Sequence, residues 1–196
     1  VYSVNASKGF VFQIGEREDL RASVDAQFSG EKFDTYRGLD RATFGAAADI
    51  KYRSSAEFDA FTLAAFTQAM GEYTYSTLRR GYRFTLGVSA RQQITDKIGL
   101  FAAVLYNQRW ARSSVFDNRF GSVRVNADYA LSNSDTIYVT GEYRHGHIVS
   151  SGNGSLENLD VSEVFVVEDA FPGTQFQAYR FTGNTYISTL GYNMGF

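Results

Sequence analysis

The residue types best suited to catalysis lie in one short stretch, where His145 and His147 flank a glycine and Ser150 follows. A histidine that activates a serine hydroxyl can drive ester hydrolysis, usually with an acidic residue as the histidine's partner. The spacing of these three residues matches no hydrolase motif, and the stretch that follows is rich in Gly, Ser and Asn. We therefore favour a surface loop and expect no enzyme, with lipid hydrolysis by His147 and Ser150 as an alternative.

Acidic residues that follow this cluster in the sequence are the only candidate metal ligands. They are Glu157, Asp160, Glu163, Glu168 and Asp169. Carboxylates are ligands for divalent cations, but nothing in the sequence requires them to converge, so a solvated loop is favoured. The chain has no cysteine, which excludes disulfides, thiolate zinc sites and cysteine nucleophiles. We expect no metal and no cofactor.

The elements that must position these residues are strands. Apolar and polar side chains alternate with a period of two, which places them on opposite faces of a sheet. The segments that alternate are 1–14, 20–29, 41–52, 59–72, 81–93, 98–110, 119–129, 136–145 and about 185–196. No stretch approaches the roughly 18 apolar residues of a membrane helix, and the single proline, Pro172, leaves the strand ladders intact. The sequence predicts an all-β fold.

The last segment alternates most strictly and ends on an aromatic residue. Tyr186, Leu190, Tyr192, Met194 and Phe196 share one face, whereas the other face holds small or polar residues and Ile187. This pattern resembles the closing strand of bacterial outer-membrane β-barrel proteins, whose terminal Phe is recognised by the assembly machinery. The resemblance implies an antiparallel transmembrane β-barrel in the bacterial outer membrane, with lipid and lipopolysaccharide around it and the assembly machinery as a partner through Phe196.

Connections between the segments fit such a barrel, because short and long ones alternate along the chain. The short ones are 15–19, 53–58, 94–97 and 130–135; the long ones are 31–40, 73–80, 111–118 and 146–183. Barrels of this kind place short turns in the periplasm and longer loops outside the cell. Residues 146–183 are therefore predicted to be a long extracellular loop that contains a hairpin, formed by 161–167 and 175–181, and offers a surface to protein partners.

The number of predicted strands is odd. Residues 20–196 supply eight strands with both ends in the periplasm, and residues 1–14 add a ninth, whereas bacterial single-chain barrels normally have an even number. Three explanations stand: residues 1–14 are an extra segment in the periplasm or lumen, a further strand lies within 160–182, or the chain is the C-terminal part of a larger barrel. We expect a barrel of 8–10 or more strands within 1–196. The chain lacks an initiating Met and a leader, so we expect a mature protein or a fragment.

Charged residues collect on the polar faces of these segments, which would line the lumen. They are Arg21, Asp25, Arg41, Asp49, Lys51, Glu72, Arg83, Arg91, Arg109, Arg124, Asp128, Glu142 and Arg144. One interpretation is a mutually neutralising network that fills a narrow barrel, since buried charges need partners. The other is a water-filled pathway whose excess of arginine attracts anions. Strand number decides between them, because eight strands leave room only for side chains.

Aromatic residues near the strand ends predict two membrane girdles, where amphipathic rings contact both lipid and water. They are Tyr52, Tyr82, Trp110, Tyr129, Tyr186, Tyr192 and Phe196. The net charge of −2 and the pI of about 5.7 give no sign of nucleic-acid binding. The favoured function is a non-enzymatic barrel that acts as a pore or export channel, or as the membrane scaffold of a surface assembly. The alternatives are a lipid hydrolase and an adhesin that binds through 146–183.

Overall fold

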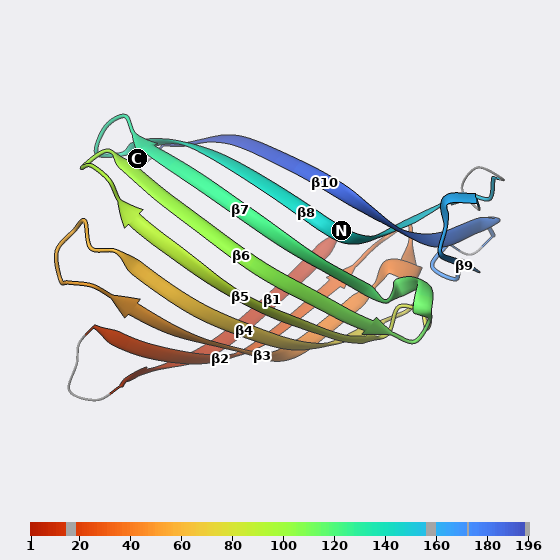
Figure 1. Cartoon of the computed structure of the whole chain (residues 1–196). Coiled ribbons are helices and arrows are strands. Elements are labelled where there is room, and N and C mark those ends of the chain that lie inside the picture. Colours follow the sequence, from red (N-terminus) through yellow and green to blue (C-terminus); the bar gives the residue numbers. More distant parts are fainter. Residues whose placement is uncertain (15–18, 156–159, 172, 195–196) are drawn as a thin grey trace.

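The computed structural model describes residues 1–14, 19–155, 160–171 and 173–194, and in them a single antiparallel sheet of ten strands dominates (Figure 1). The strands are β1 (Tyr2–Gln13), β2 (Leu20–Lys32), β3 (Arg41–Arg53), β4 (Thr62–Thr74), β5 (Gly81–Gln93), β6 (Ile98–Ala111), β7 (Asn118–Ala130), β8 (Asp135–Asn153), β9 (Val164–Val167) and β10 (Phe176–Met194). Two short 3₁₀ turns, η1 (Arg37–Leu39) and η2 (Ser114–Phe116), are added. The all-β antiparallel prediction is confirmed, whereas Glu157, Pro172 and Phe196 lie outside the described residues.

The register of the sheet carries the alternation from strand to strand, so that side chains of one kind form continuous rows. On the outer face, Val88 of β5 lies opposite Val104 of β6, which lies opposite Val123 of β7. These three valines are 57%, 54% and 45% exposed, although they sit in the middle of their strands. A folded protein in water rarely leaves such an apolar band uncovered. The rows therefore need an apolar environment on their outer side.

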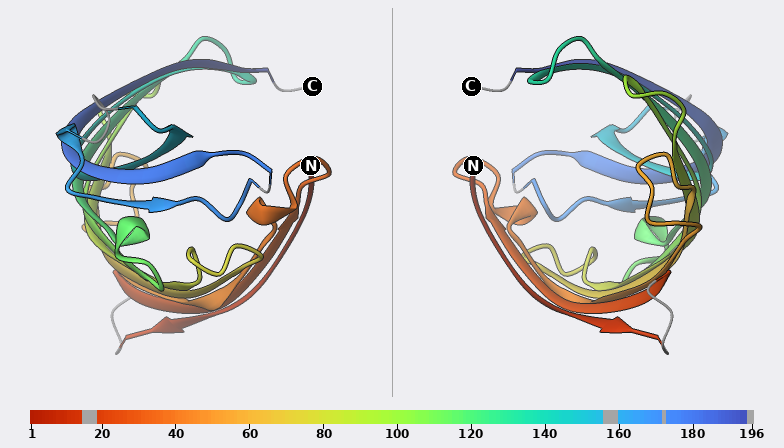
Figure 2. Two further views of the ribbon diagram at one scale, coloured as in Figure 1. Left: turned by 90° about the vertical axis from the view of Figure 1, so that its right-hand side faces the viewer. Right: turned by 90° about the vertical axis from the view of Figure 1, so that its left-hand side faces the viewer.

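The sheet curls almost into a ring but does not close (Figure 2). Each strand from β1 to β8 pairs with the next in the chain, and β10 joins the far side of β8. One edge is β1, all of whose described residues are exposed; the other is β10, from Phe181 to its end, since β9 pairs only with Gln177–Arg180. β1 and β10 lie an even number of antiparallel steps apart, so these two edges run in the same direction.

The structure bears on two of the three explanations for the odd number of strands. β1 pairs with β2 along its whole length, from Tyr2 opposite Lys32 to Gln13 opposite Arg21, so residues 1–14 are not a separate segment in the periplasm or lumen. The strand expected within 160–182 exists as β9, and the predicted hairpin with β10 is present. β9 has only four residues, however, and reaches only one end of the sheet.

The boundaries of the last strands differ from the sequence prediction. β8 continues to Asn153 and β10 begins at Phe176, so residues 146–183 are not one long loop but the ends of two strands with a shorter connection between them. The strict alternation of connection lengths is also wrong, because 54–61 is longer than 75–80 and 112–117. The connections at one end of the sheet are instead distinguished by short elements of secondary structure, because they contain η1, η2 and β9.

These segments lie just inside one mouth of the curled sheet (Figure 2), and we call them the mouth cap: η1, residues 75–80, η2, and β9 with residues 168–171. Its core consists of Val115, Phe116 and Ala178, packed against neighbours from four other segments. Those neighbours are Leu78, Ala111, Val149, Val164 and Val166. The mouth cap is the main buried apolar cluster of the described residues, whereas the middle of the curled sheet has none.

The end of β8 enters the cap through a change of direction at Gly146. This residue, at φ +147°, is the last of β8 to pair with β7, and a Cβ there would lie 2.2 Å from the carbonyl oxygen of Arg119. Beyond it β8 and β10 continue as a two-stranded ribbon. Val149 shares the alternation of the outward Tyr143 but packs on Val115 and Phe116. Among the described residues, no helix is long and apolar enough to cross a membrane.

Candidate functional site: the inner wall of the sheet

The polar face of every long strand points toward the inside of the curl, and it carries all thirteen charged residues predicted to line a lumen. Their pairing across strands shows this, because residues opposite each other in an antiparallel pair share a face. Arg21 lies opposite Lys51, Arg83 opposite Arg109, and Arg124 opposite Glu142. That each of these residues faces a water-filled lumen stays a prediction.

Glu72 of β4 is the centre of the cluster nearest the mouth cap. Its carboxylate lies 2.7 Å from Nε of Arg109 and 3.6 Å from Nε of Arg83, and its side chain is only 2% exposed. One carboxylate is thus shared by two guanidinium groups, so the cluster carries a net positive charge. Arg109 also donates from Nη2 to the carbonyl oxygen of Arg79 at 2.8 Å, which ties the wall to the cap.

Glu142 of β8 repeats this arrangement on the neighbouring strands. Arg124 donates to one of its oxygens from Nε and Nη2, at 3.0 and 2.6 Å, and Arg144 donates to the other from Nε at 2.5 Å. The carboxylate is 5% exposed, while Arg124 and Arg144 are 44% and 37% exposed. The acid is therefore shielded and the two cations face the interior of the curl.

The other charges are paired less completely. Arg41 forms a bidentate pair with Glu31, at 2.9 Å to each oxygen, and Lys51 lies 3.2 Å from Asp49. The side chain of Arg91 forms no hydrogen bond or ion pair with another described residue. The neutralising network predicted from the sequence is thus present at the two glutamates, but it leaves cationic groups without acidic partners.

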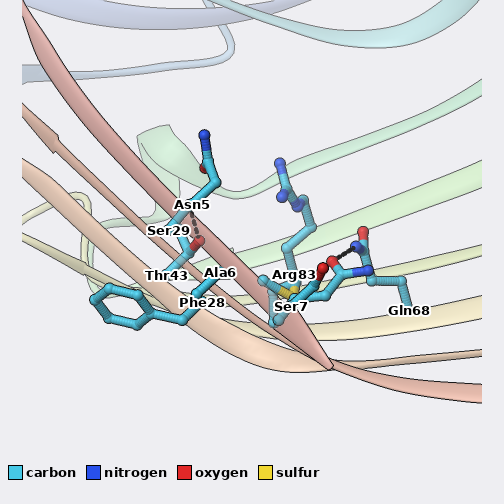
Figure 3. A pocket seen from close by; sticks show the side chains of 10 residues that line it. Asn5, Ala6, Ser7, Phe28, Ser29, Thr43, Gln68 and Arg83 are labelled. Atoms are coloured by element: carbon cyan, nitrogen blue, oxygen red, sulfur yellow. Dashed lines mark hydrogen bonds between the residues drawn. The ribbon is translucent and has the colours of Figure 1, made fainter. Parts of the chain in front are cut away.

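Mostly neutral hydrogen-bonding groups of β1–β4 line the part of the inner wall next to the Glu72 cluster, around a cavity of about 340 Å³ that Arg83 also borders (Figure 3). Gln68 donates from Nε2 to Oε1 of Gln27 at 2.7 Å, and the hydroxyls of Ser29 and Thr43 are 2.6 Å apart. Asn5 of β1 completes the lining. Sequence reasoning passed over this row because it selected charges, although the same inward alternation could have found the amides and hydroxyls.

A second feature that the sequence did not indicate is the attachment of the mouth cap to the wall. The fully buried carboxylate of Glu168 accepts a bond from Arg79 at 2.6 Å and from Ser151 at 2.7 Å. Asp169 accepts from the hydroxyl of Ser76 and from the backbone N–H of Thr77. The expectation of a solvated acidic loop is therefore wrong at Glu168, which is buried, whereas Asp169 is exposed and attached to the cap by hydrogen bonds.

Among the described residues no group of three or more His, Cys, Asp and Glu could hold a metal ion. Glu163 instead accepts a hydrogen bond at 2.6 Å from Thr182. This bond, with the positive charge of the nearby Arg180, lowers the pKa of the Glu163 carboxyl below its ordinary value.

The histidines and Ser150 do not form a catalytic arrangement. His145 lies 2.8 Å from Oδ1 of Asn184 through Nδ1, on the outer face next to Tyr143. His147 and Ser150 both belong to β8 and are three residues apart, so their side chains point to opposite faces of the strand. The structure does not favour the lipid hydrolase.

The predicted girdle residues within the described chain are all exposed on the outer face. Tyr82 and Trp110 are cross-strand partners next to the mouth cap, while Tyr52, Tyr129 and Tyr192 lie near the opposite ends of their strands. Tyr186 differs, because its ring contacts Tyr143 at 5.2 Å, three residues before Gly146. A girdle role for these residues stays a prediction, and Phe196 lies outside the described residues.

Comparisons with known proteins bear on the fold. No protein-family model matches the sequence, and no curated protein matches it. Two solved structures of OmpT, an outer membrane protein of Vibrio cholerae, are similar: one folded in vitro, with a TM-score of 0.53, and one expressed in the outer membrane, with 0.52. This is the fold of an outer-membrane β-barrel. The sequence identity is 13% in both cases, so the likeness concerns the fold only. The match covers 94% of this chain but 56% of the OmpT chain, so this chain spans little more than half the length of that protein.

Proposed function

We propose that this protein is a bacterial outer-membrane barrel that acts as a non-enzymatic, water-filled pore with a preference for small anions. Its outer valine rows would then face lipid, and the outermost residues lipopolysaccharide. Recognition by the assembly machinery through Phe196 and binding of protein partners by 146–183 stay predictions. Strand number and the charge of the inner wall support the pore over a filled barrel or a scaffold.

Strand number supports a wide lumen. An eight-stranded barrel closes around an interior just wide enough for side chains. Here β1–β8 and β10 are all long, yet they leave the sheet open. A closed barrel that contains them has more than nine strands, and its interior is wider than that of an eight-stranded barrel.

The two open edges support a larger barrel of which this chain is one part. β1 and β10 run in the same direction, so they cannot pair with each other in antiparallel fashion. An odd number of further strands between them would restore antiparallel pairing on both sides. It would also satisfy the free backbone groups of β1, which cannot remain unpaired in lipid.

Hydrogen exchange tests this closure in the full-length protein folded in detergent micelles. If further strands pair with β1, every backbone amide from Ser3 to Phe12 should be protected, because both edges of the strand are bonded. The amides of β7, which has two partners in any case, provide the reference. Fast exchange at every second amide of β1 would contradict a closed barrel, since alternate N–H groups point to opposite edges.

The single observation that carries the anion preference is the charge of the inner wall. The thirteen charged residues predicted to line it comprise eight basic and five acidic side chains, and Arg53 and Glu31 on the same face add one of each. Glu72 and Glu142 are almost completely buried beneath the arginines that they hold. Around these two glutamates the cations are thus presented to the interior while the acids are shielded. Rings of charge select ions in pores, so this wall should favour anions.

Planar-bilayer recording tests the proposal. Under a KCl gradient the reversal potential should indicate a preference for chloride over potassium. Arg91→Gln removes a cation without an ion-pair partner and should reduce this preference, whereas Lys8→Gln, on the outer face of β1, should leave it unchanged. A purified and folded protein that never conducts would exclude the pore, and a preference for potassium would exclude the role of the arginines.

A further inference from the structure

We propose that a recess in the inner wall, at the end remote from the mouth cap, binds small zwitterions of the amino-acid type: a carboxylate at Arg91, an ammonium group between Gln93 and Asp128, and an apolar side chain over Phe101. The recess deepens the pore proposed above, because it would lie within the conduit. Its occupancy does not depend on conduction, however, and can be measured separately.

The recess has a volume of about 300 Å³ and spans β5 to β8. Its lining residues are Arg91, Phe101, Arg124, Asn126, Asp128 and Thr140. Phe101 forms the centre, with Arg91 opposite it on β5 and Asn126 opposite it on β7. Arg124 and Asp128 lie two residues from Asn126 on either side and therefore share its face. An apolar ring is thus surrounded by cationic groups on one side and an acid on the other.

Arg91 provides the position for an anion. Its side chain forms no hydrogen bond or ion pair with another described residue, and the residue is exposed within the recess. Arg124 adds a second guanidinium, although its charge is shared with Glu142. Guanidinium groups recognise carboxylates through paired N–H donors. A ligand with one carboxylate would satisfy Arg91 without displacing any interaction of the protein.

The position for an ammonium group lies above Gly99, where two acceptor oxygens converge. A Cβ added to Gly99 would lie 2.9 Å from Oε1 of Gln93 and 3.6 Å from Oδ2 of Asp128, so both oxygens lie beside the same point of the inner wall. Gln93 donates from Nε2 to the carbonyl oxygen of Thr95 at 3.0 Å. This bond orients the side-chain amide so that Oε1 of Gln93 points away from Thr95. Oδ1 of Asp128 already accepts from Asn126 at 2.6 Å, which leaves Oδ2.

Two oriented acceptors without a donor from another described residue favour a ligand that only donates. An ammonium group has three donors and no acceptor, and the charge of Asp128 complements it. The hydroxyl of Thr140 donates to Asn126, which in turn donates to Asp128, so the acid is held in place by a chain of hydrogen bonds. A simple anion would satisfy Arg91 but would be repelled by Asp128.

The separation of the two positions suits a small ligand. Strand spacing and the rise per residue place the Cα atoms of Arg91 and Asp128 about 12 Å apart. Both side chains line the same recess of about 300 Å³. A ligand whose ammonium and carboxylate are separated by one or a few carbons fits such a gap, and its side chain would then lie on Phe101.

The test measures binding to the full-length protein folded in detergent micelles, by titration calorimetry with L-leucine. The analogues 4-methylpentanoate and 3-methylbutylamine lack the ammonium and the carboxylate, respectively. Leucine should bind at least tenfold more tightly than either analogue. Arg91→Gln and Asp128→Asn should each weaken leucine binding about five- to tenfold, while Arg21→Gln, elsewhere on the inner wall, should not change it.

Gly99→Ala separates the ammonium position from a general loss of charge. Gly99 does not have a positive φ and its nearest contact is the end of the flexible Gln93 side chain, so the variant should fold. It should weaken leucine binding but leave 4-methylpentanoate binding unchanged. Equal binding of leucine and 4-methylpentanoate, no leucine binding at all, or an unaffected Gly99→Ala variant would each overturn the proposal. A protein that binds leucine but does not conduct would exclude the pore while the recess stands.

Discussion

Replacing Glu168 by alanine should release the mouth cap from the wall while the curled sheet remains folded. The side chain of Glu168 is fully buried, and it pairs with Arg79, which is 21% exposed and lies 4.3 Å above the ring of Phe116. Removing one member of a buried ion pair costs about 3–5 kcal/mol, because the other charge stays desolvated. The partial exposure of Arg79 places the expected loss near 3 kcal/mol.

The expected readout is fast hydrogen exchange in residues 160–171 and 75–80, together with trypsin cleavage after Arg79 or Arg80. The matched control is Glu163→Ala, which removes a carboxylate from the same segment but one that is 41% exposed. It should have a much smaller effect. Unchanged exchange in Glu168→Ala would show that the core around Val115 and Phe116 holds the cap without this ion pair.

Replacing Val104 by arginine should destabilise the whole barrel in lipid. Val104 lies in the middle of β6 on the outer face, between Val88 and Val123. An arginine on the lipid face of a barrel near the bilayer midplane costs about 2–4 kcal/mol, because its charge leaves water for hydrocarbon. Equilibrium unfolding by urea in lipid vesicles should show a loss of that size.

The control for this variant is Leu105→Arg, which places the same side chain one residue further on the same strand. Leu105 lies opposite Gly87 and Ser122 on the inner face, where an arginine can reach water. It should therefore cost much less than Val104→Arg. Equal losses in the two variants would mean that the two faces do not differ in environment, which would contradict the orientation of the sheet.

The strands could be predicted from the sequence because alternation is a local property. Val123, Val125 and Tyr129 on one face, with Arg124 and Asn126 on the other, indicate a strand and its orientation without knowledge of its neighbours. The extensions beyond Gly146 could not be predicted in this way. Ser150–Asn153 has the composition of a turn, yet it is strand, because β10 supplies its backbone partners in the tertiary structure.

The same distinction applies to the inner-wall charges: the sequence predicts the face on which each one lies, but not its partners. Alternation places Glu72, Arg83 and Arg109 on one face, but the sharing of one carboxylate by two arginines depends on the register of three strands. The pair Arg79–Glu168 joins residues 89 positions apart in segments without a period, so no local pattern indicates it. The ammonium position above Gly99 likewise arises from the absence of a side chain, which has meaning only beside Gln93 and Asp128.

The most direct test of the account is the environment of consecutive side chains along β7 in lipid vesicles. Nitroxide labels placed one at a time from Ser122 to Ala127 report collisions with oxygen, which concentrates in lipid, and with a water-soluble nickel complex. The labels at 123, 125 and 127 should favour oxygen, and those at 122, 124 and 126 should favour nickel, because the two faces alternate between hydrocarbon and a water-filled lumen. Equal access of the nickel complex at all six positions, or its exclusion from 122, 124 and 126, would contradict the account.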